Sequence, residues 1–63
     1  MMALNEALDR LAHDEPRKAK VVELRFFGGM TEEEVSKVLG VSVDTVTRDW
    51  RFARAWLRSQ MES

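Results

Sequence analysis

Residues 31–46 read TEEEVSKVLGVSVDTV and contain the start of one helix, its end and the start of another. Thr31 and Glu34 have the spacing of a capping box, in which each side chain accepts a hydrogen bond from the other residue's backbone N–H. Met30 and Val35 occupy the two positions of a hydrophobic staple around this box. The glutamates of the first turn also suit the positive end of a helix dipole. The pattern therefore predicts a short helix that begins directly after Thr31.

The next residues predict where that helix ends and where another begins. Leu39 is its last apolar position, and Gly40 is expected to form the turn, because glycine adopts backbone conformations that bulkier residues resist. Ser42 is the predicted cap of the following helix, with Val41 and Val46 at its staple positions. Two helices joined by such a short turn form the pattern of a helix-turn-helix.

The last helix is predicted to run from the Ser42 cap to about Arg58. Apolar residues recur along it at intervals of three or four positions, which places them on one inner face. These residues are Val46, Trp50, Ala53 and Leu57. We expect Trp50, and also Trp56, to be buried or partly buried by this packing.

The residues before position 16 predict a further helix. Leu4, Leu8 and Leu11 recur at helical spacing and place it over residues 3–12. His13, the only histidine, follows as a solvent-exposed residue.

A second helix is predicted from Pro16, which suits a first helical turn, with Asp14 or Glu15 as its cap. Gly28-Gly29 is expected to end it, because a glycine after the last turn can become left-handed without a Cβ penalty. Its apolar positions are Val21, Leu24 and Phe27, with Val22 and Phe26 flanking them. The sequence as a whole predicts an all-α, compact four-helix domain with a helix-turn-helix, one domain spanning residues 1–63.

The composition excludes several classes of function. With 63 residues, 44% hydrophobic and 33% charged, the chain has the composition of a small folded domain. It has no cysteine and a single histidine, so neither a metal site nor a disulfide is expected. No apolar run approaches the roughly 20 residues that a membrane-spanning helix needs. No catalytic triad and no phosphate-binding glycine loop is present, so we expect neither an enzyme nor a cofactor.

The charges are unevenly distributed along the chain. Residues 1–34 carry a net charge of −3 and residues 35–63 a net charge of +2. The outer side of the last helix is expected to carry Asp44, Thr47, Arg48, Arg51, Arg54, Ala55 and Arg58. Threonine and arginine near a helix N-terminus suit base edges in the DNA major groove. Arginines further along suit phosphates, although a solvated charged face would have the same composition.

The chain resembles region 4 of bacterial sigma factors of the sigma-70 family, and within it the ECF and ECF-like branch. The resemblance rests on VVELRFFGGMTEEEV (residues 21–35), VLGVS (38–42) and Thr45-Val46, and the aromatic tail of residues 48–57 is similar to one ECF-like group. It covers about residues 4–58. It implies recognition of the minus-35 promoter element by the last helix, attachment to RNA polymerase through the β-subunit flap, and a cytoplasmic location. An anti-sigma factor is a further candidate partner.

The resemblance also implies roles for individual residues. The positions that match base-reading positions of the family are Val43, Asp44, Thr47 and Arg48. Those that match backbone-contacting positions are Arg25, Thr31 and Arg51, and Arg54 joins them as an arginine further along the outer face. Two acidic residues of the last helix do not fit a purely basic DNA-binding helix. Asp44 either accepts from a cytosine amino group or helps to cap the helix, and Asp49 is expected to pair with a neighbouring arginine.

Three aromatic residues have two interpretations each. Phe52 and Trp56 either pack under the first helix or form part of a surface for a partner, and packing is favoured. Phe26 is expected in the core, and otherwise faces the polymerase or an anti-sigma factor. These three residues are the candidates for a polymerase-facing surface.

Two other functions remain open from the sequence. The output domain of a response regulator has the same helix-turn-helix pattern, but usually continues into a further dimerisation helix. A protein-interaction module that has lost DNA binding would explain the low net charge and the acids on the last helix. In the sigma factor family a region 2 engages the minus-10 element, and 63 residues leave no room for it, so we expect the chain to be part of a longer protein.

Overall fold

The computed structural model describes residues 3–62, which form four α-helices and one π-helical turn and include no strand. In chain order the elements are α1 (Leu4–Asp14), α2 (Pro16–Val22), the π-helical turn η1 (Glu23–Phe27), α3 (Glu32–Leu39) and α4 (Val43–Glu62). The predicted all-α fold with four helices is confirmed.

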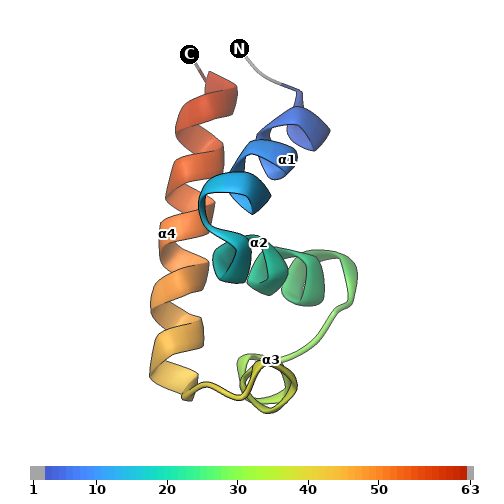
Figure 1. Cartoon of the computed structure of the whole chain (residues 1–63), viewed down its shortest axis with the longest axis vertical. Helices are drawn as coiled ribbons and strands as arrows, with labels where there is room; N and C mark the ends of the chain where they lie inside the picture. The colour runs from blue at the N-terminus through green and yellow to red at the C-terminus, as the bar shows by residue number, and fades with distance from the viewer. Residues whose placement is uncertain (1–2, 63) are drawn as a thin grey trace.

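The longest helix, α4, forms one side of the molecule along its whole length (Figure 1). Its 20 residues span about 30 Å at 1.5 Å per residue, nearly the full 33 Å extent of the chain. In Figure 1, α1 lies beside the C-terminal half of α4, α2 beside its middle, and α3 beside its N-terminal end. The other three helices thus pack on one face of α4, and its opposite face is left exposed.

Two clusters of buried residues hold the helices together. The first joins α1, α2 and α4 through Leu11, Ala19, Val22 and Ala53. The second joins α2, α3 and α4 through Val21, Val35 and Val46. Trp50 packs against both clusters. The predicted inner face of the last helix is confirmed, since Val46 and Ala53 are fully buried and Trp50 and Leu57 are half-buried.

The local signals around the helix-turn-helix form as predicted. The Thr31 hydroxyl accepts from the Glu34 N–H at 3.1 Å, and the Glu34 carboxylate accepts from the Thr31 N–H at 2.9 Å. Gly40 ends α3 in the left-handed conformation, with φ +69°. The Ser42 hydroxyl accepts from the Thr45 N–H at 3.1 Å and so caps α4. The turn between α3 and α4 is therefore fixed by its own residues.

Helix ends differ from the prediction at two places. α1 spans Leu4–Asp14 rather than residues 3–12, because the chain stays helical until Glu15. Glu15 precedes Pro16, and a residue before proline is disfavoured in the helical conformation. α4 continues past Arg58 to Glu62, and an ion pair between these two residues, with 3.2 Å between nitrogen and oxygen, supports the additional turn.

The expected core location of Phe26 is wrong, and Phe27, an apolar position of the predicted second helix, does not enter the core either. Both side chains are exposed, at 63% and 60%. The reason is the π-helical turn, which is wider than an α-helical turn and shifts these residues away from the buried face of α2. The two glycines that follow end the helix with different roles. A Cβ on Gly28 would lie 2.7 Å from the Leu24 carbonyl oxygen, whereas Gly29 takes the left-handed conformation at φ +67°.

Two general properties of residues 3–62 bear on function. No helix in this part of the chain combines the length and the apolar character that crossing a membrane requires. No three acidic or histidine side chains within it converge as metal ligands would.

Candidate nucleic-acid interface

The predicted base-reading residues lie in the first two turns of α4. Val43, Asp44 and Arg48 are exposed there. Val46, on the opposite side of the same turns, is buried against α3 and α2. The packing therefore holds the N-terminal end of α4 firmly and leaves these three side chains accessible.

Thr47 differs from the other three predicted base-reading residues. It is half-buried, and its hydroxyl donates a hydrogen bond to the Glu32 carboxylate at 2.9 Å. Sequence reasoning assigned Glu32 only to the helix dipole and did not predict this contact. No local pattern relates the two residues, which are fifteen positions apart and meet only because α3 packs on α4.

Two of the predicted phosphate contacts flank the start of α3. Thr31 is exposed, and its hydroxyl oxygen already serves as the helix cap. Arg25 is half-buried, and its Nη1 donates to the Met30 carbonyl at 2.9 Å. The Arg25 guanidinium also lies 5.2 Å from the centre of the Trp50 ring. Arg25 thus links the turn before α3 to α4, a role that the sequence did not suggest.

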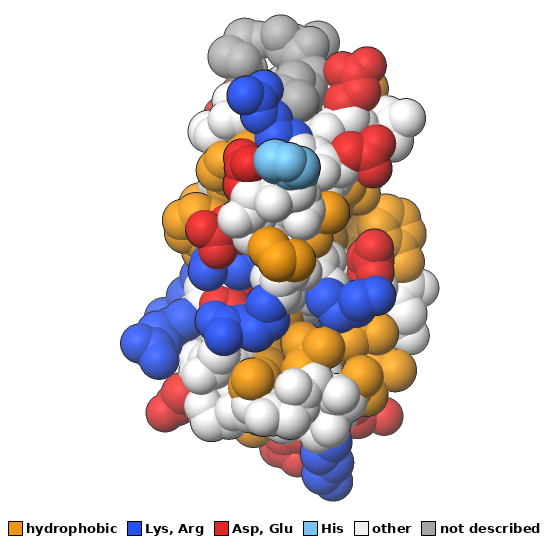
Figure 2. Space-filling model, viewed as in Figure 1, with side chains coloured by type: hydrophobic (Ala, Val, Ile, Leu, Met, Phe, Trp, Pro, Cys, Tyr) orange, Lys and Arg blue, Asp and Glu red, His pale blue; other side chains and the backbone are white. Residues whose placement is uncertain are grey.

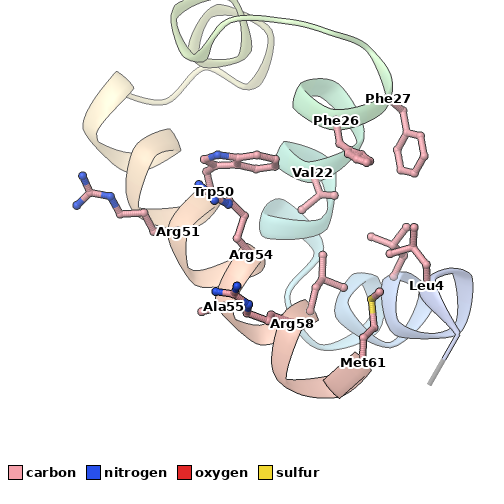
Figure 3. A pocket seen from close by; sticks show the side chains of 12 residues that line it. Leu4, Val22, Phe26, Phe27, Trp50, Arg51, Arg54, Ala55, Arg58 and Met61 are labelled. Carbon is pink, nitrogen blue, oxygen red and sulfur yellow. The ribbon is translucent and has the colours of Figure 1, made fainter. Parts of the chain in front are cut away.

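The arginines of α4 do not form the single side that was expected. Arg51, Arg54 and Arg58 border a groove between α4 and the α1–η1 side of the molecule. Figure 3 shows Arg51 pointing away from this groove, whereas the Arg54 guanidinium lies 5.7 Å from the Trp50 ring. Arg48 lines a separate hollow on the other flank of α4. The basic side chains therefore occupy two flanks of one helix.

The hollow beside Arg48 contains two basic residues that sequence reasoning missed. Arg17 and Lys18, in the first turn of α2, line it together with Arg48. Arg17 donates from Nε and Nη2 to the Asp49 carboxylate at 2.6 and 3.2 Å. This hydrogen bond and the charge of Asp49 raise the pKa of Arg17 above its ordinary value. The expected arginine partner of Asp49 is thus found on α2 and not next to it on α4.

Basic side chains gather at mid-height of the face shown in Figure 2, toward the side along which α4 runs, with an acidic group among them. Acidic side chains on this face lie mostly toward its two ends. The net charge of −1 for the whole chain thus conceals a basic band across one face.

The groove on the other flank is apolar and about 610 Å³ in volume. Val22, Trp50 and Leu57 lie in it, and Phe26 and Phe27 stand at its edge on η1 (Figure 3). The two phenylalanine rings contact each other edge to face, with 5.0 Å between their centres. An apolar hollow with two exposed aromatic rings at its edge therefore lies on this flank of α4.

The three candidates for a polymerase-facing surface do not lie together. Phe26 is exposed at the groove. The favoured packing of Phe52 under the first helix is wrong, because Phe52 is 45% exposed on the opposite flank, with the Lys18 ammonium 5.1 Å from its ring centre. Trp56 packs against the cluster that contains Leu11, so the packing interpretation holds for this residue.

The fold and the exposed N-terminal end of α4 define a helix-turn-helix domain of four helices. The sequence model of the family described as ECF sigma factor matches residues 1–63, the whole chain. The chain belongs to the ECF sigma factor family. No curated protein and no solved structure matches it.

Membership of this family defines the general function. Sigma factors act in transcription initiation, bind DNA and RNA polymerase, and are not a family of enzymes. The resemblance found in the sequence is therefore confirmed, while the individual contacts stay predictions.

Proposed function

We propose that this domain is region 4 of an ECF-type sigma factor and binds the minus-35 promoter element through the first turns of α4. The observation that carries the proposal is the position of Val43, Asp44 and Arg48. All three are exposed on a helix end that a cap and a buried cluster hold in place. A helix presented in this way fits the DNA major groove, where side chains of its N-terminal part reach base edges.

The proposed contacts are of two kinds, those to base edges and those to backbone phosphates. Arg48 would bind a guanine, Asp44 would accept from a cytosine amino group, and Val43 would contact the groove surface. Arg51 and Arg54, together with Arg25 and Thr31 near the start of α3, would neutralise backbone phosphates. Arg17 and Lys18 lie beside Arg48 and add positive charge on its flank. Phosphate contacts of this kind supply affinity without reading sequence.

Binding of short duplexes as a function of salt tests the proposal. The affinity should fall steeply as salt rises, because phosphate binding releases counterions. We expect Arg48→Ala to lower affinity and to relax the preference at one base position, since a bidentate contact discriminates by about 1–3 kcal/mol. Arg54→Ala should weaken binding about equally for all sequences and reduce the salt slope by about one unit.

Arg10→Ala is the matched control for these two variants. Arg10 is exposed on α1, which lies beside the C-terminal half of α4, so the variant removes the same charge away from the N-terminal turns of α4. It should leave both the base preference and most of the affinity unchanged. A hydrophobic surface for a protein partner would bind that partner with an affinity that hardly changes with salt. Failure of the chain to bind duplexes in a salt-dependent way would therefore favour the protein-interaction module over DNA binding.

We also infer that the apolar groove bordered by Phe26 and Phe27 is the surface for RNA polymerase, with the β-subunit flap as the occupant. Exposed phenylalanines beside a groove of 610 Å³ support an apolar partner there. Most of the groove lies on the side of α4 that faces α1 and η1, away from Arg48. Arg48, the proposed base-reading arginine, thus lies outside the flap surface, whereas Arg51 and Arg54 border both the flap surface and the DNA surface.

A further inference from the structure

The hydrogen bond between Thr47 and Glu32 uses the only proton of the threonine hydroxyl. Thr47 Oγ1 donates to Glu32 Oε1 at 2.9 Å, from α4 to the first turn of α3. A carboxylate accepts hydrogen bonds and cannot donate them, so the direction of this bond is fixed. A hydroxyl has one donor and two acceptor sites. What Thr47 still offers to a ligand is therefore an acceptor.

From this bond we infer that Glu32 is a specificity-determining residue for DNA, acting through Thr47. This inference rests on the proposed binding of DNA by the first turns of α4. In the major groove adenine presents an N6 amino donor and cytosine an N4 amino donor, whereas guanine O6 and thymine O4 are acceptors. Thr47, held as an acceptor, selects adenine or cytosine on the strand that it contacts and rejects guanine and thymine.

The position of Glu32 explains how one orientation is maintained. Glu32 is the first residue of α3, whose start is fixed by the Thr31–Glu34 capping box. Its carboxylate also lies near the positive end of the α3 dipole, where a negative charge is stabilised. Thr47 is half-buried against it, so the hydroxyl cannot rotate freely to suit a different base. A serine or threonine in open solvent would serve as donor or acceptor equally well.

A negative charge at this place also opposes DNA binding. Glu32 is only half-buried, and it lies beside residues that would meet the negatively charged duplex. Its presence therefore lowers overall affinity while sharpening the choice at one base pair. A residue that only joined α3 to α4 would affect stability and would leave the base preference unchanged.

The test is selection of binding sites from a randomised DNA duplex library by the 63-residue chain and its variants. For the unaltered chain we expect one position restricted to adenine or cytosine on one strand. Glu32→Ala should reduce that discrimination about tenfold at this position only, because the hydroxyl becomes free to donate to guanine or thymine. Thr47→Val should remove the discrimination at the same position.

Two conservative variants separate the hydrogen bond from the charge. Glu32→Gln keeps an acceptor oxygen at the same reach, so it should retain the preference while raising the overall affinity. Thr47→Ser keeps the hydroxyl and should also retain the preference. Glu33→Ala is the matched control, because Glu33 is an exposed neighbour in the same helical turn. It removes one charge without touching Thr47. Thermal melts of every variant verify that it is folded.

The possible outcomes distinguish this inference from the proposed function. Sequence-specific DNA binding with an unchanged preference in folded Glu32→Ala would overturn the role of Glu32 alone. The same holds if Glu32→Ala and Thr47→Val altered different base positions. Absence of salt-dependent DNA binding by the unaltered chain would overturn the proposed function, and this inference with it.

Discussion

Arg17 of α2 and Asp49 of α4, thirty-two positions apart, form an ion pair with 2.6 Å between Nε and Oδ2. Asp49 is the one buried charged side chain among residues 3–62, whereas Arg17 is half-exposed. Lys18 adds a second, longer contact to the same carboxylate at 3.7 Å. The pair fixes α2 against α4 at the level of Arg48. It thus connects the stability of the fold to the geometry of the proposed DNA surface.

The two halves of this pair should respond unequally to removal. Arg17→Ala leaves a buried carboxylate with only the distant Lys18 ammonium, and an uncompensated buried charge is strongly destabilising. Asp49→Ala leaves a half-exposed guanidinium that water can solvate. We therefore expect the larger fall in urea midpoint for Arg17→Ala. The double variant Arg17→Ala/Asp49→Ala should be more stable than the sum of the two single losses predicts. If the two losses were strictly additive, this result would contradict a direct coupling between Arg17 and Asp49.

Gly40 gives a prediction about the turn of the helix-turn-helix. Its φ of +69° is left-handed, and a Cβ there would meet no atom within 4 Å, so the cost of a side chain is conformational. We expect Gly40→Ala to lower the free energy of unfolding by about 1–2 kcal/mol, and Gly40→Val by somewhat more. Gly40→Asn is the control, because asparagine tolerates this conformation better. Chemical denaturation followed by circular dichroism measures all three, and equal stability of the valine variant would contradict the assigned turn.

The parts of the fold that the sequence predicted are those fixed by residues close together in the chain. The Thr31–Glu34 box, the Gly40 turn and the Ser42 cap each depend on residues within four positions, so their spacing is sufficient. The inner face of α4 follows from helical periodicity alone.

The features that the sequence did not predict depend on distant residues or on a change of helical register. Phe26 and Phe27 follow an apolar pattern that continues into the core only if α2 stays α-helical, and the π-helical turn breaks that register. The contacts of Asp49 with Arg17 and of Thr47 with Glu32 join different helices. Spacing along the chain does not predict which polar side chains of two packed helices will contact each other. The sequence therefore placed the candidate residues on one helix, but it did not predict that the structure divides them between two flanks of that helix.

The capping box should make stability depend on pH in acid. Glu34 accepts the Thr31 N–H, and this hydrogen bond lowers the pKa of Glu34 below its ordinary value of 4.5. A group whose pKa is lower in the folded state contributes stability that is complete above its unfolded pKa and is lost as pH falls through its folded pKa. We expect the melting temperature to fall as pH decreases below 4.5, with Glu34 contributing part of the fall. Glu34→Gln should have a lower melting temperature near neutral pH, and its melting temperature should fall less as pH decreases because it lacks the contribution of Glu34. If the melting temperatures of the two proteins changed with pH in parallel, the prediction would be contradicted.

Phe26 and Phe52 provide a matched pair for locating the polymerase surface. Both are exposed phenylalanines, but Phe26 borders the apolar groove and Phe52 lies on the opposite flank of α4 beside Lys18. Truncation of one aromatic at an interface typically costs more than about 1 kcal/mol of binding, and about 2 kcal/mol or more at a hot spot. We therefore expect Phe26→Ala to weaken binding of a β-flap fragment about tenfold and Phe52→Ala to leave it nearly unchanged.

Calorimetric titration of both variants with the flap fragment measures this difference, with DNA binding measured alongside. Because both rings are exposed, neither truncation should unfold the domain, and melting curves verify this. Trp56→Ala would be a poor test, since Trp56 packs against the buried cluster around Leu11 and its loss would disturb the fold. If Phe52→Ala alone reduced flap binding, the polymerase would dock on the flank that carries Arg48. The flap and DNA would then compete for one surface, and the assignment of the flap to the apolar groove would be wrong.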